Sequence, residues 1–190
     1  MFISIKIRQM KPLEINEAKQ PAKEILEATK EKMGAVPNMF RMMANNPSLL
    51  IAYTKADETF RNDSGFTPQE QEIILLSIAI YNGCSYCVAA HSFLAIKEGN
   101  VGRDVLEAIR AQEELPDQKL NALSKFATSV AQERGYPTNE ATKALKDAGY
   151  RDEHIAGVLT GVGMKTMSNY INHIAETEVD DMFSDYSWEK

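Results

Sequence analysis

The chain has 190 residues, a length that suits a single domain with a sizeable apolar interior. Its formal net charge is −6, and lysine and arginine form no cluster, so the charge pattern excludes a nucleic-acid-binding protein. The sequence has neither a run of about eighteen apolar residues nor a secretory leader pattern, so we expect a cytoplasmic protein without membrane contact.

The first third of the chain predicts an arm followed by two helices. Residues 1–20 form the expected N-terminal arm, and the weak alternation of the first ten residues suits an extended conformation. Apolar residues at helical spacing predict a helix over 21–33, which starts at Pro21 and stops at Gly34. A second amphipathic helix is expected over 47–60, with a loop over 61–65.

The next helix has the best-defined start in the sequence. Thr67, Pro68 and Glu70 supply an N-cap, a favoured first residue and a capping box. The residues from Ile73 to Tyr81 are apolar nearly all round, so this helix should be central and buried. Asn82-Gly83 should end it, and a second helix should begin near Cys84.

This helix pair carries the residues with the most chemistry. Cys84, Cys87 and His91 are spaced by three and four residues, so a helix places them on one face. If the chain folds back at Asn82-Gly83, Glu72 comes close to His91, orients it, and His91 reaches Cys87 one turn back. A thiol near a helix N-terminus or an imidazolium is favoured as thiolate, which is the nucleophile.

The remaining chain also predicts helices. One continues past the cysteines to Gly99, a short one lies near 105–109, and an amphipathic one spans 120–130. Thr138 and Asp152 are the expected N-caps of the last two, the second of which continues to Ile174. Within that final helix, Gly157 and Gly161 are interpreted as points of close packing. With no run of strands, the fold class is all-α.

Other interpretations of these residues remain open at this level. The two cysteines can be small buried residues, or zinc ligands together with His91. A structural zinc site needs four ligands, so His173 or Glu72 would have to complete it. His154 is expected to be exposed, His173 is assigned no chemistry, and Tyr86 is interpreted mainly as a packing residue.

The residues also carry a resemblance to a known family. The pattern of Glu72, eleven residues, Cys84-x-x-Cys87, three residues and His91 resembles the signature of AhpD-like alkylhydroperoxidases in the carboxymuconolactone decarboxylase superfamily. The segments 34–47 and 169–174 resemble its peroxidase-related members, so the likeness spans about residues 20–182. One departure is Tyr86, since some AhpD proteins have histidine directly before the second cysteine.

The resemblance implies an AhpD-like helical bundle over residues 21–182, a C-terminal tail over 183–190, and a homo-oligomer, either a trimer or a hexamer. It implies an antioxidant peroxidase in which Cys87 attacks a hydroperoxide and Cys84 resolves it as a disulfide. A protein or lipoyl-type dithiol would reduce the pair, and neither cofactor nor metal is expected. True carboxymuconolactone decarboxylases lack this cysteine pair, which makes their activity the less expected one.

The catalytic hypothesis is therefore a peroxidase with Cys87, Cys84, His91 and Glu72 as its site. Two alternatives are kept: a thiol-disulfide oxidoreductase whose substrate is not a peroxide, and a non-catalytic or zinc-binding helical oligomer.

Overall fold

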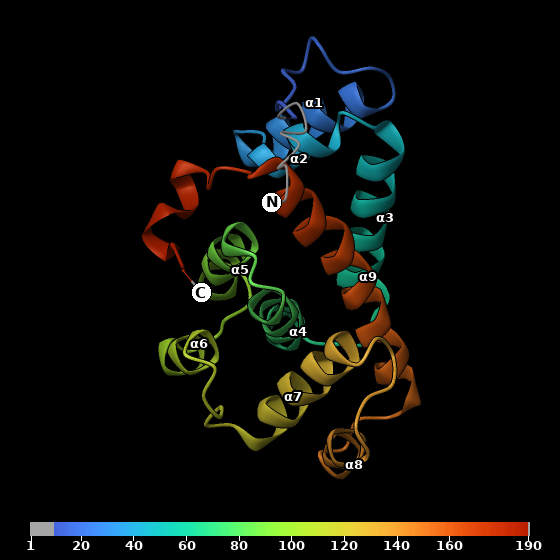
Figure 1. Cartoon of the computed structure of the whole chain (residues 1–190), viewed down its shortest axis with the longest axis vertical. Helices are drawn as coiled ribbons and strands as arrows, with labels where there is room; N and C mark the ends of the chain where they lie inside the picture. The colour runs from blue at the N-terminus through green and yellow to red at the C-terminus, as the bar shows by residue number, and fades with distance from the viewer. Residues whose placement is uncertain (1–9, 190) are drawn as a thin grey trace, which may run out of the picture.

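The structure is a computed structural model, and it describes residues 10–189. The described chain is all-helical, as predicted (Figure 1). The extended arm expected for the first ten residues lies almost wholly outside the described part. The helices are α1 (Ala22–Met33), α2 (Asn38–Met43), α3 (Pro47–Asp63), α4 (Pro68–Tyr81), α5 (Ser85–Lys97), α6 (Arg103–Arg110), α7 (Gln118–Gln132), α8 (Asn139–Asp147), α9 (Asp152–Ala175) and the 3-10 helix η1 (Asp181–Tyr186).

Helix α4 is the centre of the fold. Its side chains from Glu70 to Ile80 are all buried, and it packs against α5, α6, α7 and α9. The predicted capping box is present, with Thr67 Oγ1 accepting from Glu70 N and Glu70 Oε2 accepting from Thr67 N. The sequence therefore specifies both where this helix starts and that no face of it meets solvent.

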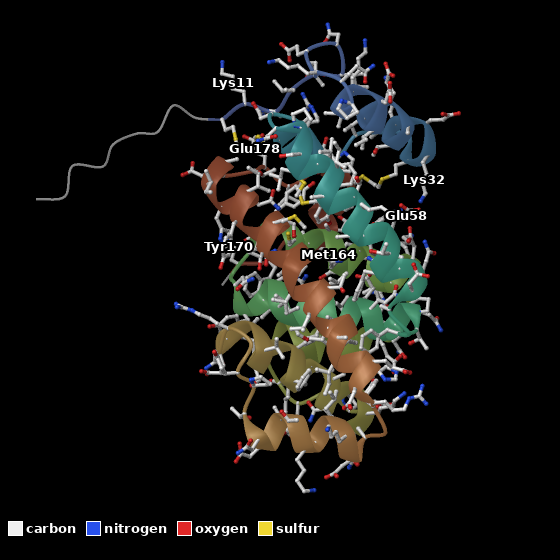
Figure 2. All side chains as sticks on the ribbon, turned by 90° about the vertical axis from the view of Figure 1, so that its right-hand side faces the viewer. Lys11, Lys32, Glu58, Met164, Tyr170 and Glu178 are labelled. Carbon is white, nitrogen blue, oxygen red and sulfur yellow. The ribbon has the colours of Figure 1, made fainter. Side chains whose placement is uncertain are left out.

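Helix α9 runs across the molecule beside α3 (Figure 2). Its close approach depends on glycine, as expected: a Cβ built on Gly161 would lie 2.9 Å from Ile74 Cγ2, and one on Gly157 would lie 2.9 Å from the carbonyl oxygen of Ser64. Figure 2 shows Tyr170 of this helix at the edge of the molecule, and its side chain is 54% exposed. One face of α9 is therefore exposed while the opposite one packs tightly on α4.

Two predicted boundaries were wrong. Helix α3 continues to Asp63, which places Arg61 on a helix instead of in the expected loop over 61–65. Asp152 is the first residue of α9, and Arg151 is its N-cap. His154 is half-buried, not exposed, because its Nδ1 accepts from Arg151 N at 3.0 Å and its ring packs against Phe66 and Tyr150.

None of the helices in residues 10–189 is both long enough and apolar enough to cross a membrane.

Candidate active site

The turn between α4 and α5 brings the predicted acid and base together. Gly83 adopts a φ of 69°, a conformation that glycine takes at no steric cost, and Cys84 then serves as the N-cap of α5. Helix α5 returns alongside α4. As a result, Glu72 Oε2 lies 2.9 Å from His91 Nδ1, the pairing expected from the sequence.

Arg61 is a third member of this pair that the sequence did not reveal. Its Nη1 lies 2.6 Å from Glu72 Oε1, and its Nε lies 3.5 Å from Asp57 Oδ1. Burial alone would raise the pKa of Glu72, but the His91 and Arg61 contacts outweigh burial and lower it. The carboxylate of Glu72 is therefore ionised, and both of its oxygens have a partner.

The pairing with Glu72 fixes the protonation state of His91. Burial and the charge of Lys165 lower the pKa of the imidazole, and Glu72 only partly offsets them, so the ring is neutral at neutral pH. A carboxylate only accepts hydrogen bonds, so Nδ1 carries the proton and donates it to Glu72. Nε2 is then left with a free lone pair, as a general base requires.

The two thiols lie at the start of α5 and meet α9. Both are buried and unlinked. Asn172 Nδ2 donates to Cys87 Sγ at 3.3 Å and makes a longer contact of 3.9 Å with Cys84 Sγ. Helix α9 thus supplies a polar contact to the thiol pair, although it lies more than eighty residues further along the chain.

The surroundings of the two sulfurs shift their pKa values in opposite directions. The hydrogen bond to Cys87, together with burial, raises the pKa of Cys84. Burial acts in the same direction on Cys87, but the bond from Cys84 and the charges of Lys165 and His91 hold its pKa well below the usual value. Of the two thiols, Cys87 is therefore the one that loses its proton more readily.

A cavity of about 500 Å³ opens onto Cys87. His91, Tyr53 and Lys165 share its wall with apolar side chains, among them Met39, Phe40 and Leu94. Cys84 is not among the described residues that line it. A small molecule in this cavity therefore meets Cys87 first, and Cys84 lies behind it.

The C-terminal residues close one side of the cavity. Phe183 of η1 is buried, lines the cavity and packs edge-on against Tyr86. Tyr86 donates from its hydroxyl to Asp180 Oδ2 at 2.6 Å and accepts from Met39 N at 3.3 Å. Tyr86 has a structural role, since its hydroxyl ties the C-terminal segment to α2 and α5.

The histidines and carboxylates needed to complete a zinc site are placed elsewhere. Residues 10–189 contain no group of three or more His, Cys, Asp or Glu side chains arranged to hold a metal ion. His173 is exposed on α9 and stacks on Tyr170, and Glu72 is engaged by Arg61 and His91.

Sequence reasoning missed Arg61, Tyr53, Lys165 and Asn172 as parts of this site. A signal existed for the two on α9. Lys165 is in helical phase with the buried positions Gly161, Ser168 and Asn172, so a charged residue occupies a stripe that should be apolar. Arg61 gave no such signal, because it fell in a stretch interpreted as a loop.

Comparisons with known proteins agree with this fold. The sequence model of the carboxymuconolactone decarboxylase family matches residues 47–117, a segment that contains Glu72, both cysteines and His91. Curated proteins gave no significant match.

Solved structures match over nearly the whole chain. An AhpD-core, peroxidase-related protein from Ralstonia eutropha is 23% identical, with a TM-score of 0.78 and 92% of this chain and 93% of that one covered. A cysteine-to-alanine variant of the debrominase Bmp8 in complex with 2,3,4-tribromopyrrole is 17% identical, with a TM-score of 0.77 and coverage of 93% and 94%. A peroxidase-related protein from a Silicibacter species is 20% identical, with a TM-score of 0.75 and coverage of 95% and 97%.

The fold and the thiol pair at the start of α5 define an AhpD-like helical protein. The match to the carboxymuconolactone decarboxylase family model over residues 47–117 and the shared fold confirm the resemblance read from the sequence. These relationships support an enzyme in general.

Proposed function

We propose that the protein is a thiol-dependent peroxidase that reduces organic hydroperoxides through Cys87 and Cys84. The observation that carries this proposal is the asymmetry of the pair: the low-pKa Cys87 lines the cavity, whereas Cys84 is buried behind it and donates to it. The attacking sulfur must reach a substrate, and the resolving sulfur needs only to reach the first sulfur.

The steps follow from this arrangement. His91 Nε2 accepts the proton of Cys87 while Glu72 holds the ring. The thiolate attacks the terminal oxygen of the hydroperoxide; a sulfur–oxygen bond forms, the oxygen–oxygen bond breaks, and an alkoxide leaves and is protonated to the alcohol. Cys84 then attacks the Cys87 sulfenic acid, which releases water and forms a disulfide.

The cycle closes by thiol-disulfide exchange with an external dithiol, either a protein or a lipoyl-type group. We place this cycle in the cytoplasm, where reduced dithiols are available, and assign it an antioxidant role. A homo-oligomer is part of the proposal, and the exposed face of α9 around Tyr170 and Ile174 offers apolar surface for it.

The direct test is intact mass with thiol counting after one equivalent of hydroperoxide. Wild type should lose about two mass units and both free thiols, and Cys84→Ser should gain about sixteen units as the sulfenic acid. Cys87→Ser should show neither change and no turnover. Full peroxide turnover by Cys87→Ser would reject the assignment of the nucleophile.

The same thiol pair serves two rival activities, thiol-disulfide oxidoreduction and, given the debrominase relative, dehalogenation of an aromatic ring. Steady-state rates with a hydroperoxide, a model disulfide and a bromopyrrole, measured with one dithiol, separate the three. A kcat/KM that is highest for the hydroperoxide supports the proposal, and one that is highest for either other substrate replaces it.

A further inference from the structure

Lys165 is a buried cation that takes no part in the peroxidase cycle proposed above. It lies on α9 with 1% of its surface exposed, and its Nζ has no hydrogen-bond partner within residues 10–189. Burying an ammonium without a partner is costly, so such a group is rare unless it meets a ligand or a counter-charge. Lys165 also lines the cavity, although its Nζ itself is covered by neighbouring atoms.

Several anionic side chains lie around the cavity, and their contacts show which one is the counter-charge of Lys165. Glu72 is occupied by Arg61 and His91, and Asp57 lies next to Arg61. The remaining buried anion is the thiolate of Cys87, and the charge of Lys165 is one of the causes that lower the pKa of that thiol. The reacting sulfur is thus the counter-charge of this lysine.

Lys165 and Cys87 interact electrostatically, but they are not hydrogen-bonded to each other. The hydrogen bond to Cys87 Sγ comes from Asn172, and Nζ makes none to either sulfur. Both groups nevertheless line one cavity. A hydroperoxide placed against Sγ therefore lies in the electrostatic field of the lysine.

We propose that Lys165 is a further catalytic residue, whose ammonium binds the leaving oxygen of the hydroperoxide and donates a proton to it. This inference rests on the proposed peroxidase function. Charge develops on that oxygen only as the oxygen–oxygen bond breaks, so a donor fixed there stabilises the transition state more than the bound substrate.

The proton and electron balance is complete within the site. Cys87 loses two electrons and gains the terminal OH, the oxygen–oxygen bond receives those electrons, and the alkoxide takes a proton from Lys165 to become the alcohol. His91, which received the thiol proton, then returns it to the neutral lysine. One hydroperoxide and two thiols give one alcohol, one water and one disulfide.

The neighbouring donors are already engaged. Arg61 is held by Glu72, and Asn172 Nδ2 is held by the sulfurs. His91 donates through Nδ1 to Glu72, and its Nε2 is the proton acceptor for the thiol. Tyr53 and Tyr86 also line the cavity, and the Tyr86 hydroxyl donates to Asp180, so Tyr53→Phe is the matched control for loss of a donor.

The test compares two oxidants that differ in their leaving group. An alkyl hydroperoxide such as tert-butyl hydroperoxide expels a strongly basic alkoxide, whereas peracetic acid expels a weakly basic carboxylate that needs no proton. Lys165→Met should lower kcat/KM by about 100-fold or more for the alkyl hydroperoxide and by about 10-fold or less for the peracid. Lys165→Arg should restore part of the first loss, and Tyr53→Phe should leave the ratio of the two rates unchanged.

The experiment distinguishes failure of the Lys165 inference from failure of the peroxidase proposal. If wild type turns over neither oxidant, the proposed function falls and the inference falls with it. If wild type is active and Lys165→Met, shown to be folded by circular dichroism, loses the same factor with both oxidants, the lysine acts through the thiolate alone and the leaving-group role is rejected. A change of ratio in Tyr53→Phe instead would assign that role to the tyrosine.

Discussion

Two buried polar regions of this molecule are built in opposite ways. Around Glu70, Oε1 accepts from Lys119 Nζ at 2.9 Å and from the Tyr150 hydroxyl at 2.7 Å, while Oε2 accepts from the amide and hydroxyl of Thr67. On the inner face of α9, which we define as Lys165, Asn169 and Asn172, three buried polar atoms have no partner among the described residues: Lys165 Nζ, Asn169 Nδ2 and Asn172 Oδ1.

The difference separates a polar group used for folding from one kept for chemistry. The saturated carboxylate of Glu70 joins α4 to α7 and to the segment between α8 and α9, and no lone pair is left for a ligand. The inner face of α9 carries unused donors and acceptors beside a reactive sulfur, at a cost in stability that a purely structural role does not explain. Proteins commonly accept such costs at functional sites.

The largest expected effect concerns Glu72 and Glu70, two positions apart on one helix. Glu72→Gln should lower kcat/KM for hydroperoxide by about 100-fold or more, because His91 loses the carboxylate that fixes its tautomer. Glu70→Gln should leave kcat/KM within about threefold of wild type, since no reacting group touches it. Steady-state assays of both variants check this prediction. An equal loss of kcat/KM in the two variants would show that the Glu70 and Glu72 networks do not differ in their role in catalysis.

The next effect concerns stability on the inner face of α9. In a Cys87→Ser background, where the thiolate is absent, Lys165→Met should raise the free energy of unfolding by about 1–3 kcal/mol, because it removes an unpaired buried charge. In the reduced wild-type background the gain should be smaller, because the same change also deprives the thiolate of its cation.

Urea unfolding of the four proteins in this cycle measures that coupling. A loss of stability on Lys165→Met in both backgrounds would mean that the lysine side chain is a packing element, and that its burial carries no cost.

The smallest effect is a pH dependence of the Glu70 network. Burial opposes ionisation, but the bonds from Tyr150, Thr67 and Lys119 lower the pKa of Glu70 to about 2. A lowered folded-state pKa adds stability above the unfolded value near 4.5, and this stability is lost as the pH falls toward 2. Because the Lys119 end is half-exposed and screened, we expect about 2 kcal/mol.

The measurement is the difference in urea stability between wild type and Glu70→Gln at pH 6 and again near pH 2. The difference should shrink by about that amount at the lower pH, whereas a constant difference would show that the carboxylate charge does not contribute.

The sequence predicted features that depend on neighbours along the chain. Thr67 and Glu70 defined the start of α4, Asn82-Gly83 defined its end, and the fold-back between them was enough to pair Glu72 with His91. These features depend on short-range interactions, because the residues that determine a helix cap or a turn lie within a few positions of it.

The features it missed depend on contacts between distant segments. Asn172 reaches Cys87 across 85 positions, and no local pattern specifies that α9 lies against α5. Arg61 became a partner of Glu72 because α3 continued past its apolar stripe, where helix propensity gave no clear boundary. Phe183 and Trp188 near the C-terminus likewise meet distant parts of the chain, since Phe183 packs on Phe93 of α5 and Trp188 Nε1 donates to the Arg110 carbonyl of α6.

The position of Cys84 as the N-cap one turn from Cys87 also sets the thermodynamics of oxidation. A disulfide between them would close a loop of about four residues, which restricts the unfolded chain by only about 2 kcal/mol, against nearly 5 kcal/mol for a loop of about 100 residues. Each oxidation or reduction therefore changes the free energy of unfolding by less than half of what a crosslink across about 100 residues would change. The redox cycle of this pair is thus coupled only weakly to global folding, compared with a long-range crosslink.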